Sequence, residues 1–112
     1  MLELDEIYAP LHLRERNQRR DPHRDGFAGP CLACDAPVKE GSGVMVHLHM
    51  GGGTIVTEVE ARAWEAECAA DKTRTCDSGD LGGYPIGPEC YRKHKAKLKP
   101  YVDDFIAHYG RT

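Results

Sequence analysis

The chain has 112 residues, of which 40% are hydrophobic, and its mean hydropathy is −0.58. This length accommodates one domain and excludes a second independent core, and the modest apolar content predicts a thin core that a bound metal would help to close. With 15 basic and 18 acidic residues the net charge is −3, so overall charge does not attract the chain to nucleic acids or anionic membranes.

The N-terminus and the cysteines indicate the compartment. No apolar run approaches the roughly 20 residues of a membrane span, and the acidic start MLELDEIYAP differs from the basic start of a signal peptide. Five cysteines are an odd number, and two of them form a Cys-x-x-Cys pair, which favours thiolate metal ligands over a disulfide framework. We therefore expect a cytoplasmic protein that does not bind membranes.

Residues 1–26 are expected to form an N-terminal arm that is partly helical or disordered. The arm starts acidic and becomes arginine-rich, and Pro10 suits the first turn of a short helix. Turn-forming residues over 21–26 predict a linker. Residues 27–112 are then expected to form a zinc-binding α+β domain, which begins with the cysteine pair and a loop over 35–43.

Residues 44–57 predict a β-hairpin. Val44, Val46 and Leu48 alternate with polar positions that include His47 and His49, so one strand face is apolar and the other carries imidazoles. Three glycines at 51–53 can adopt the positive φ angles of a tight turn, and β-branched residues behind them supply the return strand.

Helices are predicted after the hairpin. Thr57 and Glu60 fit a capping box that starts a helix over 58–70, in which Cys68 is interpreted as a core residue. Polar residues over 71–83 predict an exposed loop, and residues 82–88 predict an extended piece that ends in a turn. Pro88 suits the first position of a last helix, which we expect to be interrupted near Pro100.

Cys31, Cys34 and Cys90 are the candidate ligands of a structural Zn²⁺ ion. Zinc takes about four nitrogen or sulfur ligands in a tetrahedron, and a Cys-x-x-Cys pair supplies two of them from one turn. Cys90 is expected at the start of a helix, where exposed amides and the helix dipole stabilise a thiolate. Together, the knuckle, the hairpin and the helix-borne cysteine predict a small treble-clef-like zinc module.

The residue pattern leaves the fourth ligand open. His94 follows Cys90 by four residues on the same helix face, so both side chains could reach one ion. His47 lies on the polar face of the hairpin strand that leaves the knuckle, and His49 shares that face. Cys76, from the predicted loop, is a further alternative.

The chain resembles small zinc-ribbon or treble-clef-like proteins encoded by bacteriophages. The resemblance covers about residues 29–94 and is carried by Cys-Leu-Ala-Cys, by Val-His-Leu and by Gly-Gly-Tyr-Pro-Ile-Gly-Pro-Glu-Cys. It implies metal-ligand roles for Cys31, Cys34 and Cys90, and it ranks His47 above His94 as the fourth ligand. It also implies a phage origin, and hence the host cytoplasm as the location.

The favoured function is that of a binding or regulatory module without enzymatic activity, in which zinc stabilises the fold and the surface recognises a host or phage protein. The alternative is nucleic-acid binding through a basic helix face over residues 92–99. Its five cations are Arg92, Lys93, Lys95, Lys97 and Lys99. The stretch 57–80 opposes this alternative because it contains seven acidic and three basic residues.

A third possibility is a degenerate nuclease of the His-Asn-His type. Its zinc-knuckle versions also place a hairpin and a helix beside a Cys-x-x-Cys pair, and His47, His49 and His94 would supply the base and the metal ligands. The single asparagine of the chain, Asn17, precedes the knuckle, so the asparagine of that motif is missing.

Overall fold

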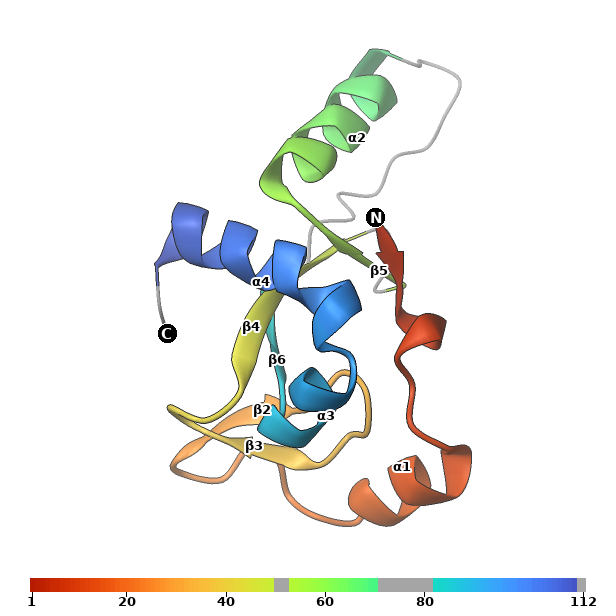
Figure 1. Cartoon of the computed structure of the whole chain (residues 1–112), viewed down its shortest axis with the longest axis vertical. Coiled ribbons are helices and arrows are strands. Elements are labelled where there is room, and N and C mark those ends of the chain that lie inside the picture. The colour runs from red at the N-terminus through yellow and green to blue at the C-terminus, as the bar shows by residue number, and fades with distance from the viewer. Residues whose placement is uncertain (50–52, 71–81, 111–112) are drawn as a thin grey trace.

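The computed structural model describes residues 1–49, 53–70 and 82–110. Within these ranges the chain forms a four-stranded antiparallel sheet, a separate two-stranded sheet and four α-helices (Figure 1). The expected α+β class is therefore confirmed. None of the described helices is both long enough and apolar enough to cross a bilayer.

The larger sheet has the strand order β1-β5-β4-β6. Its strands are β1 (Leu2–Glu3), β5 (Thr54–Val56), β4 (Val44–His49) and β6 (Gly82–Ile86). The predicted hairpin is confirmed, because β4 and β5 pair antiparallel with His47 opposite Val56. The extended piece before Pro88 is also present, as β6, which pairs with the other edge of β4.

Two glycines permit close packing around β4. Gly43 has a φ of +71°, and a β-carbon there would lie 2.3 Å from the carbonyl oxygen of Ile86. A β-carbon on Gly83 would lie 2.8 Å from the ring of Phe105. Larger residues at either position would push a neighbouring element away from the sheet.

The smaller sheet is a hairpin of β2 (Phe27–Pro30) and β3 (Pro37–Lys39). It encloses the Cys-x-x-Cys pair. The expectation of a loop over 35–43 is therefore wrong for the three residues of β3. Pro30 and Pro37 lie opposite each other in this hairpin, and prolines make a strand hard to predict from sequence. Val38 is buried in the core and holds β3 in place.

The first two α-helices are α1 (Leu11–Asn17) and α2 (Glu58–Ala70). At the start of α2 the Glu60 amide donates to the Thr57 hydroxyl at 3.2 Å, and the Thr57 amide donates to the Glu60 carboxylate at 3.1 Å. This reciprocal pair confirms the predicted capping box. Cys68 is buried on α2, as expected, but it is disulfide-bonded, so the expectation that the cysteines serve as thiolates rather than in disulfides is wrong for this residue. The loop predicted over 71–83 lies largely outside the described residues.

The C-terminal helical region breaks at a different place from the one predicted. Helix α3 (Pro88–Lys93) ends at His94, and α4 (Lys95–Tyr109) continues through Pro100. Leu98, Val102 and Phe105 are all buried and follow one another at four and three residues, so they share one face of α4. Burial of this face outweighs the cost of about 3 kcal/mol for an interior proline.

The first seven residues contribute to the core. β1 pairs with β5, the 3₁₀ turn Leu4–Glu6 follows it, and the amide of Leu4 donates to the Gly53 carbonyl at 3.0 Å. The boundary between arm and domain at residue 26 stays a prediction, but the start of the chain is not a solvated arm. The buried cluster contains Leu2, Leu4, Ile7, Cys31, Ala33, Val38, Val46, Leu48, Ile55, Ile86, Leu98 and Val102.

Candidate metal centre

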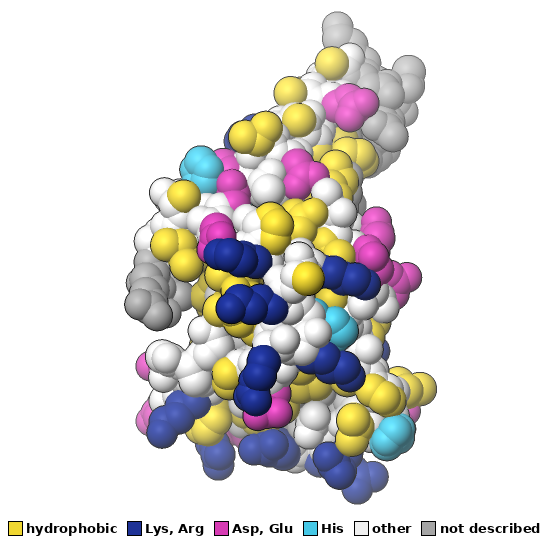
Figure 2. All heavy atoms as spheres, viewed as in Figure 1, with side chains coloured by type: hydrophobic (Ala, Val, Ile, Leu, Met, Phe, Trp, Pro, Cys, Tyr) yellow, Lys and Arg dark blue, Asp and Glu magenta, His cyan; other side chains and the backbone are white. Residues whose placement is uncertain are grey.

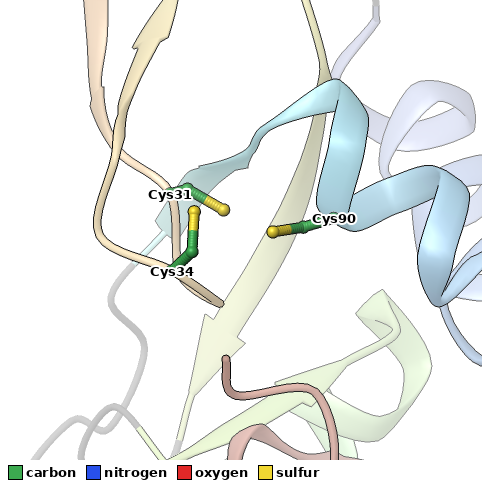
Figure 3. A group of neighbouring side chains, drawn as sticks. All are labelled: Cys31, Cys34 and Cys90. Carbon is green, nitrogen blue, oxygen red and sulfur yellow. The ribbon is translucent and has the colours of Figure 1, made fainter. Parts of the chain in front are cut away.

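Three cysteines from two distant segments meet at one point of the fold. The Sγ atoms of Cys31, Cys34 and Cys90 all lie within 4.8 Å of one another. Figure 3 shows Cys31 and Cys34 on the loop between β2 and β3 and Cys90 on the first turn of α3, with their sulfurs directed toward a common centre. The sequence prediction that these residues come together is borne out by this geometry.

The loop that carries the first two cysteines is a tight turn. The Asp35 amide donates to the Cys31 carbonyl at 2.9 Å, and the Cys31 amide donates to the Ala36 carbonyl at 2.8 Å. Asp35 takes a φ of +64°, a left-handed conformation that aspartate tolerates better than most residues. These contacts hold both sulfurs on the same side of the turn.

The surroundings of Cys31 favour a thiolate. The neighbouring Cys90 thiol is the largest cause that lowers the pKa of Cys31 to about 5. Burial opposes the shift, whereas the Gly87 amide, which donates to Cys31 Sγ at 3.3 Å, contributes to it. Cys90 and the Gly87 amide therefore together stabilise negative charge on the Cys31 sulfur.

The other two thiols keep their protons when no cation is present. The neighbouring Cys31 sulfur raises the pKa of Cys90, and burial raises the pKa of Cys34. Two more thiolates beside the first would repel one another unless a cation neutralised them. A divalent metal supplies that charge and displaces both protons.

The spacing of the sulfurs suits zinc. Zinc–sulfur bonds of about 2.3 Å in a tetrahedron separate the sulfurs by roughly 3.8 Å. The observed limit of 4.8 Å requires only a small contraction of the trio, within reach of side-chain rotation. All three donors are soft thiolates, which excludes Mg²⁺ and Ca²⁺ as natural occupants.

His47 lies away from the sulfurs. Its imidazole is buried, its Nδ1 is 3.6 Å from a Glu58 carboxylate oxygen, and its ring packs edge-on against Tyr109. His49 is also buried, and its Nε2 lies 3.7 Å from Glu65. The polar strand face that the alternation predicts is thus covered by α2 and α4 rather than directed at the knuckle.

His94 does not join the sulfurs either. It occupies the junction between α3 and α4, where its amide donates to the Cys90 carbonyl at 3.0 Å. Burial, with the nearby charges of Lys93 and Lys97, lowers its pKa. In the described part of the chain no histidine lies within 4.8 Å of all three sulfurs, and Cys76 is outside that part.

Helix α1 supports the knuckle, a role that the sequence did not indicate. The Asn17 side chain donates to the Cys34 carbonyl at 2.9 Å, and Arg14 and Gln18 bind the Asp35 carboxylate at 3.2 and 2.9 Å. These residues occur at helical spacing in an arginine-rich stretch, which is typical of a solvated helix face. Only the tertiary contact with the knuckle distinguishes them.

A pocket of about 590 Å³ lies between α1 and α3, next to the sulfurs. We call it the α1–α3 pocket. Cys34 and Cys90 line it, whereas the fully buried Cys31 does not. Its other lining residues are Ala9, Pro10, Leu13, Arg16, Asn17, Glu89, Arg92 and Lys93.

Comparisons with protein-family models, with curated proteins and with solved structures found no match to this chain.

Proposed function

We propose that the chain is a small zinc-stabilised module that binds a partner protein and has no catalytic role. The observation that carries this proposal is the convergence of three thiol ligands from segments that are 56 residues apart in the sequence. A metal at this point would tie the β2–β3 hairpin to α3 and to the core, because Cys31 belongs to the buried cluster. Its binding energy would thereby become folding energy.

The arrangement of the ligands supports a treble-clef-like assignment. A knuckle hairpin supplies Cys31 and Cys34, and the first turn of a following helix supplies Cys90. The same residues carry the resemblance to phage-encoded zinc proteins, so we propose that origin and a cytoplasmic location together with the assignment.

Exposed apolar residues beside the α1–α3 pocket support a protein partner. Leu11 is 63% exposed and Tyr8 is 39% exposed, and both lie next in sequence to residues that line the pocket. Apolar and aromatic side chains near a concave surface are the usual centre of a protein interface. We propose that this surface makes the contact.

Nucleic-acid binding is the second candidate. All five cations of residues 92–99 are exposed, and Figure 2 shows Lys and Arg side chains gathered over α1, α3 and the start of α4. Three of them already face carboxylates: Arg92 with Glu89 at 3.0 Å, Lys97 with Glu6 at 3.8 Å and Lys99 with Asp103 at 2.8 Å. Because these carboxylates partly neutralise the basic face, we rank nucleic-acid binding below protein binding.

Metal analysis tests the zinc proposal. The purified protein should contain one zinc per chain, and Cys31→Ser should lose the metal, since a serine hydroxyl is a poor zinc ligand. Cys68→Ser, which alters a disulfide-bonded cysteine outside the trio, is the control and should keep the metal even if the loss of the disulfide lowers the melting temperature. A Cys31→Ser protein with full zinc content and an unchanged melting temperature would contradict the site.

A gel-shift titration with mixed DNA and RNA tests the second candidate. We expect at most weak binding that disappears as salt rises, because few phosphates would be neutralised. Tight binding that persists at about 0.2 M salt would favour nucleic acid over protein as the partner.

A further inference from the structure

Zinc takes four ligands in a structural site, and the cysteine trio supplies three of them. In residues 1–49, 53–70 and 82–110, no fourth sulfur, imidazole nitrogen or carboxylate oxygen lies within 4.8 Å of all three sulfurs. Cys31 is fully buried, whereas Cys34 and Cys90 are half-buried and line the α1–α3 pocket. The trio is thus closed on the side of Cys31 and open toward the pocket.

The charge of the pocket indicates what would enter it. Three thiolates and one Zn²⁺ ion carry a net charge of −1, and the rim adds three cations and one carboxylate. Arg92 is paired with that carboxylate, Glu89, at 3.0 Å. Arg16 and Lys93 then offset the thiolate charge and favour an anionic ligand. Ala9, Pro10 and Leu13 form an apolar wall on one side of the pocket.

We propose that the α1–α3 pocket admits a carboxylate that takes the fourth coordination position of the zinc ion, with Arg16 and Lys93 pairing with the incoming acidic group. This inference rests on the zinc site of the proposed function. Carboxylate oxygen is an established zinc ligand at about 2.0–2.2 Å, and an open position is what distinguishes zinc sites that bind an external group. The carboxylate belongs to an acidic segment of a partner protein or to a small carboxylic acid.

Cobalt substitution tests the proposal, because the visible bands of Co²⁺ report its ligands directly. The Co²⁺-loaded protein is titrated with acetate and, separately, with pentaglutamate at equal carboxylate concentration. We expect a saturable change of the visible bands with both. Tighter binding of pentaglutamate would identify an acidic segment as the ligand, and equal binding would identify a small carboxylic acid.

The variant Arg16→Glu/Lys93→Glu should bind either probe at least about fivefold more weakly, because two charge-assisted contacts become repulsive. Lys95→Glu is the matched control: Lys95 is exposed and does not line the pocket, so its substitution should leave both titrations unchanged. Equal weakening by Lys95→Glu would overturn the assignment of the pocket.

Two further outcomes would overturn the inference while leaving the zinc module intact. The first is one metal per chain with bands that no carboxylate alters. The second is an altered spectrum in Cys76→Ser, His47→Ala or His94→Ala before any carboxylate is added, which would identify the fourth ligand within the chain. Failure to bind any metal would instead remove the proposed function itself.

Discussion

Cys31 is the residue on which the candidate site depends most. It is fully buried, it accepts a hydrogen bond from the Gly87 amide, and it belongs to the same apolar cluster as Val38 and Ile86. Its sulfur is therefore fixed in position before any metal arrives, whereas Cys34 and Cys90 sit at the pocket surface. Such a fixed ligand reduces the reorganisation that metal binding requires.

His47 is expected to be structural. Replacing it with alanine removes a buried ring that packs on Tyr109 and faces Glu58, so the protein should lose about 2 kcal/mol or more of unfolding free energy. Its zinc content should stay at one per chain, because the imidazole is not among the clustered donors. Denaturant unfolding and metal analysis of the same sample separate the two effects.

His94→Ala is the companion variant, since the sequence also made His94 a candidate for the fourth zinc ligand. It should also keep the zinc. Loss of metal from either variant would return that histidine to the ligand set and would contradict this interpretation of both residues.

The α1 helix contacts the knuckle through several hydrogen bonds, two of which end on the loop residue Asp35. Asp35 accepts hydrogen bonds from Arg14 and Gln18, and it needs a left-handed backbone. Asn tolerates that backbone and lacks the charge, so Asp35→Asn should weaken the docking of α1 by about 1 kcal/mol without distorting the knuckle. Hydrogen exchange should increase over residues 11–17.

The control for this prediction is Asp103→Asn. It removes one charge from an exposed ion pair with Lys99, and such solvent-screened pairs contribute little to stability. Exchange over α1 should not change in this variant. Unaltered exchange in Asp35→Asn as well would show that α1 is held by other contacts.

The contact between α2 and α4 should depend on pH. The Tyr109 hydroxyl donates to the Glu58 carboxylate, and this bond is the first cause of the lowered pKa of Glu58. A carboxyl whose pKa is lower in the folded protein stabilises the fold above its unfolded pKa of roughly 4.3, and this stabilisation is lost as pH falls through the folded pKa.

Tyr109→Phe tests this contact because it keeps the ring packing on His47 and Phe105 and removes only the donor. The variant should be less stable than the original protein at pH 7, by about 1 kcal/mol since Glu58 is partly exposed. The difference should shrink as the pH falls below 4.3 or so. A difference that stays constant with pH would contradict the role of the hydroxyl.

Local patterns account for the elements that sequence reasoning found. The alternation from Val44 to His49, the Thr57 and Glu60 pair and the proline at the start of α3 each act over a few residues, and each appears in the structure as predicted. The Cys-x-x-Cys turn is likewise a local feature that the sequence pattern predicts. These features need no knowledge of distant contacts.

Features that depend on tertiary contacts were missed or misplaced. Leu2, Leu4 and Ile7 lie in an acidic segment whose sequence resembles a tail, and only pairing with β5 places them in the core. The helix break moves from Pro100 to His94 because Leu98 and Val102 must face the same cluster. The alternation of residues predicts a polar, exposed face of β4 at His47, but α2 and α4 cover that face.

At the scale of the whole molecule, the trio brings together parts of the chain that are distant in the sequence. The knuckle hairpin lies at one end of the molecule, and α2 projects from the other (Figure 1). Helix α1, the hairpin and α3 all meet at the sulfurs, through Asn17, Cys34 and Cys90. In a small fold with a thin core, a metal at this junction should contribute a large share of the stability.

Zinc-edge X-ray absorption of the purified protein is the most direct test of this centre. The account predicts zinc bound by three sulfurs at about 2.3 Å and by one lighter oxygen ligand. A zinc shell without sulfur, or a protein that binds no zinc at neutral pH, would contradict it.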